Sequence, residues 1–311
     1  MSALLRVEGL RLSRTGRAVL DGISFRVAPR EICALMGLSG SGKTTVLRAA
    51  VALEGFQAGR IEVGGFSLGP GPMPPESRLR ELRRRVGMVF QSHALFEHLT
   101  ALENTALAPV YAHGRTAAEA RARGLALLDS LGIGARASAY PRELSGGEAQ
   151  RVAIAVAMAN EPALLLADEV VGQLDGQTAG RVVDEVMAAD FAVIFVTHDM
   201  SLVSHFSDRL VVMYAAKAVE IGPTRNVFAE PGHPYTQGLL DAFPSIRGPR
   251  VPLTGIPGSP PNLLHPPTGC RFAARCPHRF EACVISPGLY DTGNTLAACH
   301  LHAPSRAEAL R

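Results

Sequence analysis

The chain has 311 residues, of which 47% are hydrophobic and 5% aromatic, and it contains no tryptophan. Its formal net charge of +3 is too mild for the concentrated basic face that nucleic-acid binding requires, so we expect no nucleic-acid partner. No apolar run reaches the roughly 18 residues of a membrane-spanning helix, and the N-terminus shows no signal-peptide pattern. We therefore expect a soluble, cytoplasmic protein with one large domain and an appendage.

The first 70 residues combine two kinds of predicted strand. Residues 3–30 alternate between apolar and polar side chains around a turn at 14–17, and residues 56–70 are glycine-rich around a short strand near 61–63. These segments predict an antiparallel patch. Between them, Glu31–Met36 is an apolar run, which is typical of a strand buried on both faces of a parallel sheet.

A phosphate-binding loop follows this buried strand. Residues 37–44 read GLSGSGKT and match the pattern G-x-x-x-x-G-K-[ST] at every fixed position. Glycines let backbone N–H groups approach a phosphate closely, and a helix predicted from Thr45 adds the positive end of its dipole. We expect Lys43 to reach the outer phosphates and the Thr44 hydroxyl to ligate Mg²⁺. The predicted nucleotide contacts of this loop are Gly37, Ser39, Gly40, Ser41, Gly42, Lys43, Thr44 and Thr45.

The segment after the phosphate loop places polar residues at the ends of predicted strands. Residues 92–160 are mainly helical in pattern, and residues 161–230 return to alternating strands and helices. Three apolar runs end in polar side chains, and these side chains are Gln91, Asp168 with Glu169, and His198. Because the carboxyl ends of parallel strands form the ligand-binding edge of such a sheet, we expect these groups near the phosphate loop.

Residues 144–151, LSGGEAQR, look like the signature motif of ATP-binding cassette (ABC) proteins. With the phosphate loop and the polar strand ends in this order, the chain resembles the ATPase subunit of an ABC transporter over about residues 1–230. The resemblance implies an α/β P-loop NTPase fold, with a RecA-like core, an antiparallel β subdomain and a helical subdomain at about 92–160. We place this cassette at residues 1–229, and no internal repeat supplies a second one.

The resemblance also implies a role for each polar residue. Asp168 would hold Mg²⁺ directly or through water, Glu169 would orient and polarise the attacking water, and His198 would contact the γ-phosphate. Gln91 would sense the metal and the water. ATP would lie between this phosphate loop and the signature motif of a second cassette. Contacts from that side are expected from Ser145, Gly146, Gly147, Glu148 and Asp175.

Two positions depart from the family pattern. Family members usually carry an aromatic ring near position 15 that stacks on adenine, whereas residues 12–17 here read LSRTGR. Arg14 or Arg17 offers a planar guanidinium in its place, which puts the selectivity for the base in question. Val170-Val171-Gly172 stands where the family often has Pro-Thr-Ser, and this departure concerns coupling at the dimer interface.

The C-terminal part has a different composition. From Pro231 to Pro304 the chain is rich in proline and bears cysteines, which predicts turns and short elements. Motifs within 213–240, 256–258 and 269–277 look like those of the peptide/nickel importer branch of the ABC family. We therefore assign 230–311 to a small irregular Cys-rich extension of the oligopeptide-transporter type. The stretch Gln91–Thr100, by contrast, looks more like amino-acid or sugar importers.

Four of the five cysteines lie in this extension. Cys270, Cys276, Cys283 and Cys299 are separated by five, six and fifteen residues. A reducing cytosol disfavours disulfides, and structural zinc usually takes more closely spaced pairs. The spacing favours a 4Fe–4S cluster, with zinc or unliganded thiols as alternatives. Cys33, in the strand before the phosphate loop, is expected to be a small core residue.

These observations together predict an ATP-hydrolysing, Mg²⁺-dependent subunit that energises import of peptides, nickel or a related small solute. By resemblance its partners would be a second, non-identical ABC ATPase, two membrane permease subunits and an extracellular substrate-binding protein. It would then lie peripherally on the cytoplasmic face of the cell membrane. The alternatives are an amino-acid importer or exporter ATPase, a poorly hydrolysing regulatory cassette, and a soluble ABC ATPase outside transport.

Overall fold

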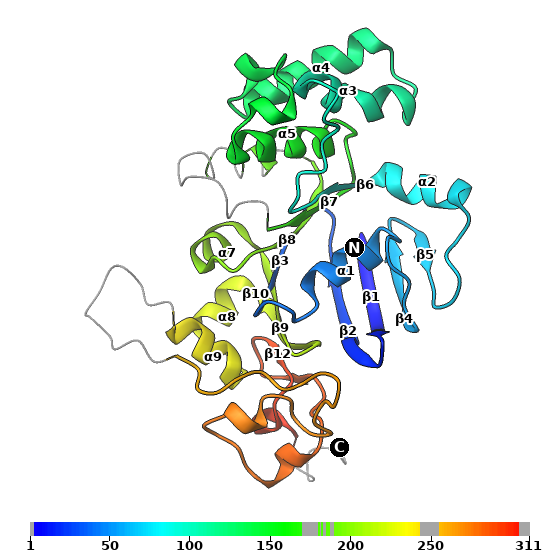
Figure 1. The fold of residues 1–311 in the computed structure, drawn as a ribbon. Helices are drawn as coiled ribbons and strands as arrows, with labels where there is room; N and C mark the ends of the chain where they lie inside the picture. Colours follow the sequence, from blue (N-terminus) through cyan, green and yellow to red (C-terminus); the bar gives the residue numbers. More distant parts are fainter. Residues whose placement is uncertain are drawn as a thin grey trace, which may run out of the picture.

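The computed structural model describes residues 3–169, 180, 182, 185–186, 190–242 and 255–304. The chain folds around two sheets, with a group of helices at one end and an irregular region at the other (Figure 1). The smaller sheet is antiparallel and has the strand order β2-β1-β4-β5, as the alternating pattern predicted. Its strands are β1 (Leu5–Arg14), β2 (Arg17–Val27), β4 (Ala58–Val63) and β5 (Phe66–Leu68).

The larger sheet has the order β11-β12-β10-β9-β3-β8-β7-β6, and its strands from β9 to β6 are parallel. Every residue of β3, β7 and β8 is buried, which explains why these segments are continuously apolar rather than alternating. Its strands are β3 (Ile32–Met36), β6 (Val86–Val89), β7 (Leu164–Asp168), β8 (Ala192–Val196), β9 (Arg209–Tyr214), β10 (Lys217–Pro223), β11 (Tyr290–Asp291) and β12 (Leu296–Ala297).

Two hydrophobic clusters lie on the two faces of the larger sheet. Ala34 and Met36 of β3 face one cluster, together with α5 (Gly146–Met158). Cys33 and Leu35 face the other, which also contains α1 (Lys43–Ala50) and the inner face of the small sheet. Successive strand residues point to opposite faces, so β3 is buried on both sides. Helix α2 (Glu76–Arg85) lies between β5 and β6 in the sequence, and its buried residues are Leu79 and Leu82.

The helical region packs α3 (Ala101–Tyr111) and α4 (Ala117–Ser130) against α5, at the end of the molecule opposite the extension (Figure 1). Each of these helices begins with a capping box, in which Thr100, Thr116 or Ser145 exchanges hydrogen bonds with the glutamate three residues later. Two 3₁₀ turns, η1 (Gly134–Arg136) and η2 (Pro141–Glu143), link α4 to α5.

The C-terminal part is built from short elements. Two short helices of the cassette, α7 (Met200–Phe206) and α8 (Thr224–Ala229), precede it, and α9 (Pro234–Asp241) is its first helix. The 3₁₀ turns η3 (Ala273–Arg275), η4 (Glu281–Val284) and η5 (His300–His302) follow. The sequence did not predict that β12 pairs with β10, so that the extension continues the central sheet. Within the described ranges, no helix has both the length and the apolar character needed to cross a bilayer.

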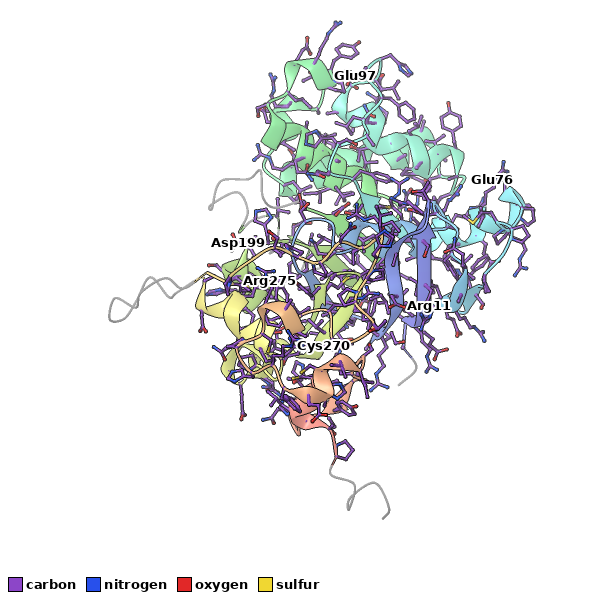
Figure 2. All side chains as sticks on the ribbon, turned by 60° about the horizontal axis from the view of Figure 1, so that its bottom comes forward. Arg11, Glu76, Glu97, Asp199, Cys270 and Arg275 are labelled. Carbon is purple, nitrogen blue, oxygen red and sulfur yellow. The ribbon has the colours of Figure 1, made fainter. Side chains whose placement is uncertain are left out.

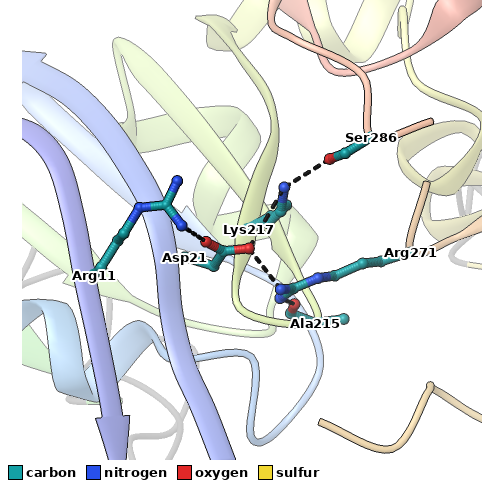
Figure 3. A network of polar contacts seen from close by, with 6 residues as sticks. All are labelled: Arg11, Asp21, Ala215, Lys217, Arg271 and Ser286. Atoms are coloured by element: carbon teal, nitrogen blue, oxygen red, sulfur yellow. Dashed lines mark hydrogen bonds and ion pairs between the residues drawn. The ribbon is translucent and has the colours of Figure 1, made fainter. Parts of the chain in front are cut away.

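An ion network joins the extension to the small sheet (Figure 3). Asp21 of β2 accepts a 2.6 Å hydrogen bond from Nη2 of Arg271, and its carboxylate also contacts Arg11 at 2.5 Å and Lys217 at 3.5 Å. The Arg271 side chain is 6% exposed and donates a second bond to the carbonyl of Ala215. Because Arg271 follows Cys270 directly, this contact fixes the cysteine-bearing segment against the cassette.

An aromatic cluster and a buried carboxylate complete the seam between the two parts. Phe272 packs edge-on against Tyr214 of β9 and Tyr235 of α9, with ring centroids 5.4 and 5.5 Å apart. Burial raises the pKa of Tyr235 to about 12, and the Leu38 backbone opposes this from the phosphate loop. Glu220 of β10 is fully buried and accepts bonds from the backbone amides of residues 232 and 233 and from the Thr295 hydroxyl.

Candidate nucleotide site

A cavity of about 480 Å³ opens between the β1–β2 turn and the start of α1. Segments far apart in the sequence meet here, because the strand ends and the small sheet converge on the phosphate loop, which we call the P-loop (residues 37–44). The cavity is lined by Arg14, Thr15, Arg17, Ala18, Val19, Ser39, Gly40, Gly42, Lys43, Thr44, Thr45, Gln91 and Glu169.

Close backbone packing explains two P-loop glycines. Gly37 has φ of 145°, and a Cβ there would lie 2.1 Å from the carbonyl oxygen of Met213. Gly42 has φ of 104°, and its Cβ would lie 2.6 Å from the carbonyl oxygen of Val19. Any side chain at either position would push the loop away from β9 or β2. The sequence predicted a helix from Thr45, whereas α1 already begins at Lys43.

Lys43 is 7% exposed and its ammonium is held over the loop. The Nζ atom donates to the carbonyl oxygens of Gly37 at 2.8 Å and Leu38 at 3.1 Å. Burial lowers the pKa of Lys43, and the carboxylates of Glu169 and Asp168 oppose that shift. The lysine therefore places a hydrogen-bond donor and a positive charge over the loop, which suits the oxygens of a polyphosphate.

Thr44 and Asp168 provide two oxygen atoms that fit a magnesium ion. The Thr44 hydroxyl donates to Oδ1 of Asp168 at 3.1 Å, although the residues are 124 positions apart. Asp168 is the last residue of β7 and is 5% exposed. Burial raises the pKa of Asp168, and the hydrogen bond from Thr44 opposes this. Carboxylate and hydroxyl oxygens beside a phosphate-binding loop are the ligands that Mg²⁺ prefers.

Gln91 and Glu169 meet at the same edge of the sheet. The Gln91 side-chain amide donates from Nε2 to Oε2 of Glu169 at 3.0 Å. Glu169 has φ of 53°, a left-handed conformation that is uncommon for a residue with a side chain, and its backbone amide donates to Val196 of β8 at 3.0 Å. The chain thus turns at the end of β7, and both Gln91 and Glu169 line the cavity.

The other predicted site residues are separate from this cavity. His198 lies two residues beyond β8 and is exposed, but it is not one of the cavity-lining residues. Ser145, Gly146, Gly147 and Glu148 form the first turn of α5, on the helical region. Asp175 and the Val170-Val171 pair lie outside the described residues. The roles of His198, the signature motif and Asp175 stay predictions.

The four cysteines of the extension lie in one region, because Cys270, Cys276 and Cys283 are all near enough to influence the Cys299 thiol; Figure 2 labels Cys270. The Cys270 amide donates to the Cys283 carbonyl at 3.0 Å. Burial raises the pKa of Cys270, Cys276 and Cys299, and neighbouring cysteines add to this for all three. The donor set suits an iron–sulfur cluster, but the geometry does not support the predicted 4Fe–4S site. Across the described ranges, no three Cys, His, Asp or Glu side chains are arranged to hold a metal ion.

Cys33 behaves as the sequence predicted for a core residue. It is fully buried in β3, far along the chain from the other cysteines, and burial raises the pKa of its thiol. Sequence reasoning missed Glu54, which binds Arg14 at the rim of the cavity. A single acid 40 residues away along the chain gives no local pattern that would have revealed it.

Family comparisons agree with this architecture. The ABC transporter family matches residues 20–172, and the oligopeptide/dipeptide transporter C-terminal region matches residues 219–283. Among solved structures, the ATP-binding cassette MJ0796, described as a dimer in a post-hydrolysis state bound to ADP and Pi, is similar with a TM-score of 0.66. It is 27% identical and covers 71% of this chain and 99% of its own.

Three curated relatives extend the similarity over most of the chain. A Brucella abortus protein whose name provisionally assigns it to ATP binding in peptide import is 37% identical over 92% of this chain and 90% of its own. The L-cystine transport system ATP-binding protein TcyN of Escherichia coli is 40% identical over 78% and 99%. The oligopeptide transport ATP-binding protein OppD of Mycobacterium tuberculosis is 37% identical over 96% and 52%.

The P-loop, the Thr44–Asp168 and Gln91–Glu169 pairs and these similarities lead to one assignment. The chain belongs to the ABC transporter family of ATP-binding proteins, as an ATPase cassette that carries the oligopeptide/dipeptide transporter C-terminal region.

Proposed function

We propose that this ATPase energises an importer of peptides, nickel or a related small solute. The observation that carries the proposal is the C-terminal region, residues 219–283, which matches the oligopeptide/dipeptide transporter type. The similarity to the Brucella protein also extends over 92% of the chain, so it includes more than the cassette. In this proposal the chain divides into the cassette at 1–229 and the extension at 230–311.

The site supports a specific division of work in hydrolysis. Lys43 and the P-loop amides bind the phosphates, and Oε2 of Glu169 is held by Gln91. Oε1 of Glu169 then accepts a proton from a water molecule while the oxygen of that water attacks the γ-phosphorus. The bond from that phosphorus to the bridging oxygen breaks, which leaves ADP and phosphate. Thr44 and Asp168 would hold Mg²⁺, which supplies positive charge for the phosphate oxygens.

A second cassette would complete the site. Ser145 caps α5, and the first N–H groups of that helix form an anion-binding terminus away from the chain's own cavity. ATP would therefore be sandwiched between the P-loop of one cassette and residues 145–148 of another, with Asp175 at the contact. His198 would approach the γ-phosphate once the site closes. Closure would then depend on ATP and opening on its hydrolysis.

The remaining partners follow from the transport role. Two membrane permease subunits would receive the helical region, an extracellular substrate-binding protein would deliver the solute, and the second ATPase would be a non-identical chain. The protein would bind peripherally at the cytoplasmic face of the cell membrane.

We also propose that the extension holds a 4Fe–4S cluster on Cys270, Cys276, Cys283 and Cys299. The support is four thiols in one region, although their side chains are not arranged around a common point. Anaerobically purified protein should contain about four irons and four sulfides per chain. The variant C283S should lose them, whereas C33A should not. Zinc in place of iron, or neither metal in the anaerobic protein, would contradict the proposal.

An amino-acid importer is the second candidate. The L-cystine relative has the highest identity of the three, 40%, but its 99% coverage corresponds to 78% of this chain. The permease-facing stretch Gln91–Thr100 also resembles importers of this kind.

The test is transport in proteoliposomes that contain this chain, its co-purified permeases and second ATPase. Uptake of a radiolabelled dipeptide or of nickel in the presence of ATP and the binding protein would support the proposal. ATP-dependent uptake of cystine alone would favour the second candidate. The variant E169Q is the control, because it should abolish either uptake.

A further inference from the structure

The end of the nucleotide cavity beyond the P-loop has an unusual wall. It is lined by Arg14, Thr15, Arg17, Ala18 and Val19, and among the described residues none that lines the cavity is aromatic. When the phosphates of ATP lie on the P-loop, the base must lie against the remaining lining, the β1–β2 turn. The only planar side chains that this turn contributes are the guanidinium groups of Arg14 and Arg17.

Arg14 is held in a fixed plane. Its Nε donates to Oε1 of Glu54 at 2.6 Å, and its Nη2 donates to Oε2 of the same carboxylate. The Glu54 side chain is 16% exposed, whereas Arg14 is 52% exposed. Two parallel hydrogen bonds fix both the position and the plane of a guanidinium. Glu54 therefore occupies one edge of the Arg14 guanidinium, and Arg14 is among the residues that line the cavity.

Glu54 is itself tied to the P-loop helix and to the small sheet. The Nε atom of Arg48, on α1, lies 3.7 Å from Oε2 of Glu54. Three residues further on, the side-chain oxygen of Gln57 accepts a 2.8 Å hydrogen bond from the Ser13 backbone amide. The backbone amide of Gln57 donates to the Arg11 carbonyl at 3.0 Å. These contacts connect the β1–β2 turn to α1, the helix that follows the P-loop.

Arg17 differs from Arg14 in this respect. It pairs with Arg14 across the turn between β1 and β2, and its side chain is exposed. Within the described ranges it makes no ion pair and no side-chain hydrogen bond. Stacking through Arg17 would require its long side chain to become ordered on binding. The conformational entropy lost in that step would reduce the affinity.

We propose that Arg14, held flat by Glu54, is the platform on which the base of the nucleotide stacks. Arg14 contacts the base, and Glu54 acts through Arg14 as a positioning residue. Every purine has a π-face, so stacking on a guanidinium does not separate adenine from guanine. The site therefore binds ATP and GTP with similar affinity.

Titration calorimetry with ATP, GTP and inorganic tripolyphosphate tests the platform, because tripolyphosphate reports the P-loop alone. R14K keeps the charge and removes the plane. We expect R14K to lower the affinity for ATP and for GTP by about 5-fold, the scale of a guanidinium–ring contact. The affinity for tripolyphosphate should stay unchanged. R17K tests the alternative platform, and the matched control R26K, at an exposed arginine of β2 that is not among the cavity-lining residues, should change none of the three affinities. Wild-type affinities for ATP and GTP should agree within about 3-fold, since stacking is base-tolerant.

The role of Glu54 needs a double-variant cycle. E54Q should lower the affinity for ATP but not the affinity for tripolyphosphate. In the R14Y background, where an aromatic ring forms the platform without Glu54, E54Q should leave the affinity for ATP unchanged. A loss of ATP affinity in R17K instead of R14K would overturn the proposal. An equal loss of tripolyphosphate in R14K, a strong wild-type preference for ATP, or an E54Q effect that persists in R14Y would also overturn it.

Discussion

The cassette core and the C-terminal extension bury their apolar side chains in opposite ways. In the cassette, β3, β7 and β8 are buried along their whole length, and the polar site residues follow directly at the strand ends. In the extension the strands have two residues each, and three 3₁₀ turns make up most of the remaining regular structure within the described ranges. Its packing rests on single contacts, such as those of Phe272 and Arg271 and the hydrogen bonds that it donates to Glu220 of β10.

In the proposed mechanism, this difference separates the residues that would act on nucleotide from those that maintain the fold. We expect the exchange of a polar residue at a strand end in the cassette to change the chemistry and to leave the buried strands intact. Removing one of the few buried contacts of the extension exposes a seam that runs along β9, β10 and β2. We therefore expect the extension to show the larger effects on stability.

The largest stability effect should come from F272A. Phe272 is 2% exposed and contacts Tyr214 and Tyr235, so truncation leaves a cavity at the seam. We expect a loss of about 3–5 kcal/mol in the free energy of unfolding, measured by urea denaturation. The control F280A truncates a ring that is 43% exposed and should change stability much less. Equal effects would show that the extension does not depend on its buried aromatic contacts.

A smaller loss is expected for E220Q. Glu220 accepts three hydrogen bonds in a fully buried position, and an amide NH₂ in place of one oxygen would face a donor. An unsatisfied buried group costs about 1–3 kcal/mol. The exposed Glu230, which accepts a single bond from Asn294, provides the control E230Q. If urea denaturation gave the same stability for both variants, the carboxylate at β10 would not be a structural link.

A pH effect of about 2 kcal/mol should come from His233. Its ring is 2% exposed and accepts the Tyr235 amide. Burial, with His302 beside it, lowers the pKa of His233 to about 3. The folded chain keeps the ring neutral, while the unfolded chain takes up a proton below its ordinary pKa of about 6.5. Stability should therefore fall as the pH drops from 6.5 towards 3.

The variant H233N isolates this contribution, because asparagine also accepts a hydrogen bond at a helix N-cap. Urea denaturation at pH 8 and pH 5 should show that the wild type loses about 2 kcal/mol more than H233N between these values. Equal losses would mean that the His233 ring is accessible to protons in the folded state.

The same comparison shows what the sequence could predict. The continuous apolar composition of β3 and β7 predicts that these strands are buried. Their parallel arrangement brings their carboxyl ends to the same edge of the sheet. The approach of Thr44 to Asp168 and of Gln91 to Glu169 follows from that rule. The left-handed φ of 68° at Gly132, just beyond α4, agrees with the predicted helix stop.

The contacts that escaped prediction depend on single residues rather than on periodic patterns. Arg271 and Asp21 are 250 positions apart, and neither lies in a motif that marks an ion pair. The two residues of β12 are too few to show a strand period, so its pairing with β10 was not predictable. The pair of Arg14 and Glu54 escaped for the same reason, although the sequence did identify Arg14 as a planar group at the site.

The central claim is that Glu169, held by Gln91, activates the water that attacks ATP. The direct test is ATP turnover and ATP affinity of purified E169Q beside the wild type, with E97Q as a control at an exposed acid on the helical region. Loss of a general base lowers turnover by roughly 10²–10⁴-fold, and the account predicts this with ATP affinity retained. Turnover near that of the wild type would contradict it.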